Sequence, residues 1–119
     1  MAGDVITTGI TVMEDNQFNE VAERELQAIA RAVDDSGIDC DAEFKASGVL
    51  EITFEDGTRM VINRHTAARE IWVAAKAGGF HFRRLGDRWV DTRDGRELRA
   101  ALSELIAGCA GEPVTLPTS

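Results

Sequence analysis

Residues 49–64 carry an alternating pattern that restricts the fold of the whole chain. The segment reads VLEITFEDGTRMVINR, and its turn is formed by Asp56 and Gly57. A period of two is typical of a half-buried strand, and Asp-Gly accepts the positive φ of a tight turn. The pattern therefore predicts an antiparallel hairpin with strands at 49–55 and 59–64 and one apolar face. The side chains predicted on that face include Leu50, Ile52 and Phe54.

Shorter alternating runs extend this sheet on both sides. Further strands are expected at 41–45, 71–75, 80–83 and 88–92, and each is bounded by turn residues. Because tight turns join them, the sheet should be antiparallel with five to six strands.

Two helices are expected at the ends of the sheet region. Apolar residues at three- and four-residue steps predict a helix over about residues 16–35, ended by Gly37. The segment Asp94-Gly95-Arg96-Glu97 resembles a capping box that would open a second helix. Each helix has one apolar stripe, so both should pack on one face of the sheet. The predicted class is α+β, an α-β sandwich.

Length and composition predict a single domain. The chain has 119 residues, of which 44% are hydrophobic, enough for one ordinary core. We expect this domain to span residues 13–119 and residues 1–12 to be a disordered extension. That extension lacks the basic start and long apolar stretch of a secretory signal, and no apolar run approaches the ~18 residues of a membrane span. A cytoplasmic location is therefore expected.

Charge is divided unevenly along the chain. The formal net charge is −8, but residues 1–56 carry −11 and residues 57–119 carry +3. An acidic chain is a poor nucleic-acid binder, so cations and basic protein surfaces are the better partners. The clustered acids are either a solvated face or a site where carboxylates hold cations loosely, with several waters retained.

Motifs of catalysis are missing. The sequence has no Gly-rich phosphate loop, no GxSxG and no HExxH, and His65 and His81 lack the spacing of a metal site. Cys40 and Cys109 fit a reducing compartment, as small buried fillers with free thiols. We do not expect an enzyme.

Trp72 is predicted on the open face of the sheet. Ile71 and Val73 should face the core, which turns Trp72 outward beside Asn63. An exposed Trp near polar groups is typical of a binding hot spot. The alternative is a Trp that lies flat over its neighbours for packing alone, and the sequence leaves both open.

Four segments resemble the frataxin family, in particular its bacterial CyaY branch. They are VLEITFEDGTRMVINR at 49–64, EIWVAAKAGGFHF at 70–82, GDRWVDTRDG at 86–95 and AGEPVTL at 110–116. The similarity runs from about residue 18 to residue 116. It implies the frataxin-like fold, with two helices against one antiparallel sheet, and a role in iron–sulfur cluster assembly.

The resemblance also implies site residues and partners. Fe(II) and Fe(III) would bind weakly at the surface, and the partners would be a cysteine desulfurase and the iron–sulfur scaffold protein. The protein would act as iron donor or as regulator of their complex. The implied metal-binding residues are Glu23, Asp34, Asp35, Asp39, Asp41, Glu43 and Glu55. The implied partner-binding residues are Asn63, His65, Ile71 and Trp72.

Some positions differ from the family pattern. His65 stands where Gln is usual and Ala67 where Pro is usual. Acids are replaced at four positions, which are Ala30, Arg31, Gly37 and Lys45. Two alternatives stay beside the leading hypothesis. One is an acidic docking module with incidental metal binding, and the other is a weak ferroxidase. We expect a monomer that iron can assemble into oligomers.

Overall fold

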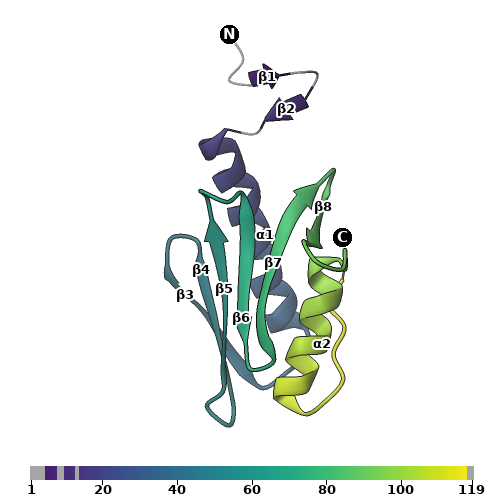
Figure 1. Ribbon diagram of the computed structural model, residues 1–119. Helices are drawn as coiled ribbons and strands as arrows, with labels where there is room; N and C mark the ends of the chain where they lie inside the picture. The colour runs from purple at the N-terminus through teal and green to yellow at the C-terminus, as the bar shows by residue number, and fades with distance from the viewer. Residues whose placement is uncertain (1–4, 8–9, 13, 118–119) are drawn as a thin grey trace.

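Two helices pack on one face of a six-stranded antiparallel sheet in the computed structural model, as the sequence predicted (Figure 1). The structure describes residues 5–7, 10–12 and 14–117. The helices are α1 (Asp15–Asp35) and α2 (Leu98–Ala110). The sheet contains β3 (Cys40–Ala46), β4 (Val49–Phe54), β5 (Arg59–His65), β6 (Glu70–Ala75), β7 (Gly78–Leu85) and β8 (Arg88–Asp91).

The sheet is a meander, in which every strand pairs with its neighbour in sequence. The order is β3-β4-β5-β6-β7-β8, and all pairs are antiparallel. The predicted Asp-Gly turn joins β4 to β5, with Gly57 at φ 90° and the Thr58 N–H donating to Asp56 Oδ1 at 2.9 Å. Side chains on one face of this sheet pack against the helices, and the opposite face of the sheet is open to solvent.

The ends of α1 follow from local hydrogen bonds. At its start the Glu14 N–H donates to Gln17 Oε1 at 2.9 Å. At its end the Ser36 N–H bonds back to the carbonyl of Ala32 at 3.0 Å, and Gly37 takes the left-handed conformation with φ 80°. The predicted stop at Gly37 is confirmed. The buried stripe of this helix consists of Phe18, Ala22, Leu26, Ile29 and Val33.

The start of α2 was predicted wrongly by one turn. The N-cap is Glu97, whose side chain accepts from the Ala100 N–H at 3.0 Å. Asp94 instead accepts from the Arg96 N–H at 2.9 Å, in a turn that precedes the helix. The helix begins later because Gly95 has φ 77° and Glu97 forms a β-bridge with Val90 of β8, so this segment is not helical.

The core lies between the helices and the sheet. Phe18 of α1 meets Trp89 of β8 edge to face, with ring centroids 5.9 Å apart. The C-terminal segment also contributes, because Leu116 is buried and its N–H donates to Ser103 Oγ of α2 at 2.9 Å. Within the described residues, no helix combines the length and apolar character needed to span a membrane.

The structure describes two short strands within residues 1–12, the segment predicted to be a disordered extension. Strands β1 (Val5–Thr7) and β2 (Ile10–Val12) pair with each other in a separate two-stranded antiparallel sheet. Their Val, Ile and Thr residues are β-branched, which favours extended backbone. For residues 1–4 and 8–9 the prediction lies outside the described residues.

We expect the chain to fold without metal. Its core is built from apolar side chains of both helices and the sheet, and the described residues contain no group of three or more side chains suited to hold a metal ion. Circular dichroism in excess chelator should therefore keep the helical signal and a cooperative thermal transition. A random-coil spectrum under chelation would contradict this, because a metal-dependent fold collapses without its ion.

Candidate functional site

Exposed carboxylates gather where α1 ends and β3 begins. Asp34 and Asp35 lie in the last turn of α1, and Asp39 and Asp41 flank the first residue of β3. Phe54 pairs with Cys40 across the two strands, which brings Glu55 to the same end of the sheet. We call Asp34, Asp35, Asp39, Asp41 and Glu55 the acidic cluster.

The cluster lies at the negative end of a helix. The C-terminal carbonyls of α1 carry partial negative charge, and the last turn, all of it described, has no basic side chain. Asp34 and Asp35 therefore add like charge to like charge. A bound cation would reduce this repulsion.

Three of these carboxylates act on the thiol of Cys40. Burial raises the pKa of Cys40, and the charges of Asp34, Asp39 and Asp41 raise it further. Asp34 of α1, Asp39 of the connection and Asp41 of β3 thus act on one sulfur atom. The end of α1 and the start of β3 therefore share one region of negative charge.

Two other predicted metal-binding residues are paired with basic side chains. Glu43 pairs with Lys45 at 2.9 Å, and Lys45 also reaches Glu51 at 3.5 Å. Glu23 lies about three turns before Asp34 along α1, and its Oε1 is 3.8 Å from Arg64 Nη1. Both carboxylates are already compensated by a base.

The geometry suits loose binding of cations. The described residues contain no group of three or more His, Cys, Asp or Glu side chains placed to hold a metal ion. The carboxylates of the acidic cluster are all exposed, so water competes at each one. Hard cations on such a surface keep several waters and exchange readily.

Neutralising one carboxylate of the cluster should make Cys40 more reactive. The thiolate is the reactive form, so a raised pKa moves alkylation to higher pH. Asp41→Asn should speed iodoacetamide labelling of Cys40 at pH 8 about twofold, measured by peptide-resolved mass spectrometry. Glu104→Gln, in α2, is the matched control and should change nothing. An unchanged rate in Asp41→Asn would contradict the shared field.

A second site occupies the open face of the sheet, around Trp72. Its indole lies between two imidazoles: His65 is 3.7 Å away with an interplanar angle of 11°, and His81 is 4.5 Å away with an angle of 10°. The indole Nε1–H donates to Glu70 Oε1 at 2.7 Å. Trp72 is half-buried.

The register of three strands explains this arrangement. Trp72 is directly opposite Asn63 on β5 and His81 on β7, and His65 is opposite Glu70. His65 is thus the diagonal neighbour of Trp72, a position that aromatic side chains can reach. Sequence reasoning missed His81 and Glu70, although the pairing of β6 with β7 would have placed His81 next to Trp72.

Ile71 is a correction to the predicted partner surface. It is 0% exposed and belongs to the core beneath the sheet. Neighbouring residues of a strand point to opposite faces, so Ile71 and Trp72 cannot serve the same surface. Asn63 and His65 do share the open face with Trp72.

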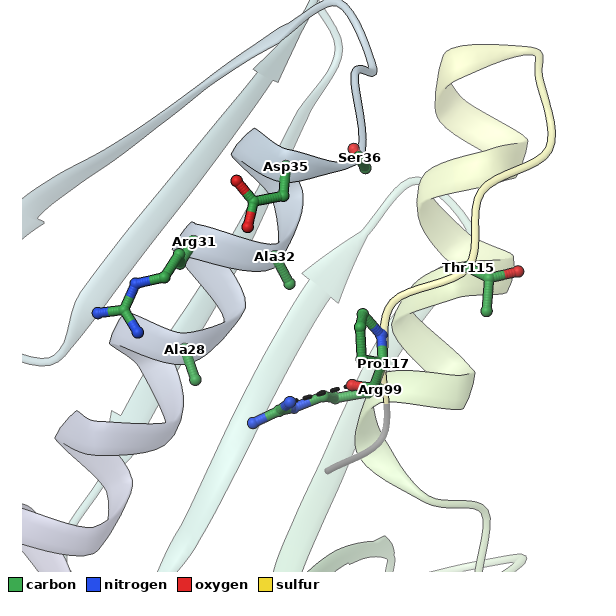
Figure 2. Close-up of a pocket in the computed structure, with 8 residues that line it drawn as sticks. All are labelled: Ala28, Arg31, Ala32, Asp35, Ser36, Arg99, Thr115 and Pro117. Atoms are coloured by element: carbon green, nitrogen blue, oxygen red, sulfur yellow. Dashed lines mark hydrogen bonds between the residues drawn. The ribbon is translucent and has the colours of Figure 1, made fainter.

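A shallow groove of about 360 Å³ lies on the helix side, between α1 and the C-terminal segment (Figure 2). In the figure, Ala28 and Ala32 point from α1 towards Arg99 and Pro117. Arg99 is already bound, because it donates to the Pro117 carbonyl at 3.0 Å and to Glu25 at 2.8 Å. The groove therefore lies where the hydrogen bond from Arg99 holds the C-terminal segment against the helices.

Fold and sites together define a small α-β sandwich with an acidic helix end and an aromatic open face. Residues 11–112 match the family model of the frataxin-like domain. The chain belongs to the frataxin-like family.

Similar proteins cover almost the same length. A protein of Dechloromonas aromatica is 49% identical over 104 residues, which are 87% of this chain and 99% of the relative. One of Paraburkholderia phytofirmans is 50% identical, over 86% of this chain and 96% of the relative. Both are named iron–sulfur cluster assembly protein CyaY.

Solved structures agree with the fold. Frataxin from Psychromonas ingrahamii superposes with a TM-score of 0.80 at 30% identity, over 87% of this chain and 97% of that one. Trimeric yeast frataxin, described as complexed with ferrous, has a TM-score of 0.61 at 20% identity, over 89% of this chain and 94% of that one. At that identity the yeast protein supports the fold alone.

Proposed function

We propose that this protein takes part in iron–sulfur cluster assembly, as a weak surface binder of iron that supplies iron to, or regulates, a cysteine desulfurase–scaffold complex. Its membership of the frataxin-like family and the names of its CyaY relatives support the general role. The observation that carries the iron-binding part is the acidic cluster at the end of α1, in which the charges of Asp34, Asp39 and Asp41 all act on Cys40.

The two surfaces suit different tasks. Carboxylates of the acidic cluster attract Fe(II), Fe(III) or a basic surface of the desulfurase, all through charge. The Trp72 face offers an aromatic anchor beside Asn63, which suits contact with the scaffold protein. We place both activities in the bacterial cytoplasm.

Addition of Fe(II) under anaerobic conditions should perturb backbone amide signals of residues 34–43. Binding should weaken in steps as Asp34, Asp35, Asp39 and Asp41 are replaced by Asn, and no single replacement should abolish it, because an open site has no essential ligand. The titration is followed by NMR, with and without the desulfurase. Perturbations centred on His65 and His81 instead would contradict this assignment.

One observation favours an alternative, an acidic docking module with incidental metal binding. The described residues offer no preformed set of three metal ligands. In that case the protein would change desulfurase activity equally with and without iron. The same titration distinguishes the two functions, and Fe(II) oxidation in air, compared with buffer, tests the ferroxidase alternative. Size-exclusion chromatography with added iron tests for oligomers.

A further inference from the structure

We infer that Glu70, His65 and His81 are positioning residues that hold the Trp72 indole in the orientation needed for docking. The inference rests on the proposed function, because it takes the scaffold protein as the partner of this face. It assigns roles to His81 and Glu70, two residues that are not among the partner-binding residues predicted from the sequence. We call these three residues the Trp72 clamp.

Glu70 fixes the edge of the indole. Its Oε1 accepts from Trp72 Nε1–H at 2.7 Å, and only 14% of the Glu70 side chain is exposed. A hydrogen bond to a carboxylate is shorter and stronger than one between neutral groups. Both residues belong to β6 at alternate positions, so the bond fixes the ring relative to its own strand.

The two imidazoles fix the faces of the indole. Trp72 has a ring within 4.5 Å on each side, and both are within about 11° of parallel. A ring enclosed on both faces cannot turn down onto the sheet, so it offers a partner its edge.

Each imidazole is itself held in place. His65 Nδ1 accepts from the Ala68 N–H at 3.3 Å, in the turn between β5 and β6. His81 Nδ1 lies 3.5 Å from Glu70 Oε1, the same oxygen that binds Trp72. The clamp therefore draws on three adjacent strands and one turn.

A shared metal site does not explain these histidines. His65 and His81 lie on opposite faces of the indole, so the ring of Trp72 separates them. One ion cannot be bound by both. The described residues also contain no group of three or more potential ligands.

Positioning has a measurable consequence for binding. A flexible side chain must be ordered when it docks, at a cost of about 0.5–1.5 kcal/mol, and a side chain already held avoids that cost. Removing one clamp residue should therefore weaken binding about threefold to tenfold, while Trp72 remains in the chain.

The test measures affinity for the scaffold protein by calorimetry in a double-mutant cycle. His81→Ala should weaken binding about threefold to tenfold in the parent and have no effect in Trp72→Ala, because the role of His81 acts through Trp72. His81→Phe keeps a ring against the indole and should restore the affinity. Likewise Glu70→Gln, which keeps an acceptor for Nε1–H, should bind more tightly than Glu70→Ala.

Two further measurements use the free protein. Acrylamide quenches exposed indoles, and Trp89 is only 1% exposed, so quenching reports Trp72. Quenching should increase in His81→Ala and Glu70→Ala, and the indole N–H signal of Trp72 should shift in NMR spectra. Thr53→Ala, on β4, is the matched control and should match the parent in both.

Each outcome has one meaning. If the parent does not bind the scaffold protein, the proposed partner is wrong, and the docking role of the clamp is wrong with it. If the parent binds but His81→Ala binds equally well, or weakens binding just as much in Trp72→Ala, the clamp alone is overturned. A loss that Phe does not restore would make His81 a direct contact of the partner and would also overturn positioning.

Discussion

Glu25→Ala is expected to lower the free energy of unfolding by about 3 kcal/mol. Glu25 of α1 and Arg99 of α2 form a two-pronged ion pair, with Nε–Oε2 at 2.8 Å and Nη2–Oε1 at 3.1 Å. Their side chains are only 12% and 14% exposed. The hydrogen bond to Glu25 raises the pKa of Arg99, and Ala at position 25 would leave a charged guanidinium without its carboxylate.

Urea denaturation measures this loss, and Glu104→Ala is the control. Glu104 pairs with Arg96 at 2.9 Å, but its side chain is exposed, so its removal should cost less than about 1 kcal/mol. The difference between the two variants separates a pair enclosed by both helices from a surface pair. Similar losses in both would contradict the role given to Glu25.

Trp72→Ala is expected to weaken binding of the scaffold protein about 30-fold, or about 2 kcal/mol, which is typical of a Trp hot spot. Apolar contact depends little on salt, so the loss should be equal at low and high ionic strength.

Charge reversal in the acidic cluster should behave differently. Asp39→Lys with Asp41→Lys should weaken desulfurase binding most at low salt, mainly by slowing association.

Thermal melting of Trp72→Ala is the necessary control. The indole is half-buried between two imidazoles, so its loss removes intramolecular contacts as well as any contact with a partner. We expect a small change in Tm beside a large change in affinity. A much lower Tm with unchanged binding would mean that Trp72 serves packing alone.

The parts of the fold predicted from sequence are those set by local periodicity. Leu50, Ile52 and Phe54 alternate in the chain and are all buried, and the stripe of α1 follows its three- and four-residue steps. The start of α2 could not be predicted in this way. Two residue types compatible with capping lie three positions apart, and the positive φ of Gly95 and the bridge from Glu97 to Val90 decide between Asp94 and Glu97.

The candidate sites depend on contacts between residues that are far apart in the sequence. Nothing near Glu23 in sequence indicates that Arg64 would approach it. The Trp72 clamp depends on the register of β5, β6 and β7 together, which no single strand pattern specifies. Ile71 is the opposite case. Strand alternation alone predicts that Ile71 faces the core, and only the family resemblance placed it among the partner-binding residues.

The meander order of the sheet has a consequence for how the chain folds. Each strand pairs with the one beside it in sequence, so the sheet can grow hairpin by hairpin with short loops to close. Contact between the two helices spans much more of the chain, since Glu25 and Arg99 are 74 residues apart. Local pairings form faster than distant ones. We therefore expect Glu25→Ala to accelerate unfolding more than it slows folding, which a chevron plot of the same variant would measure.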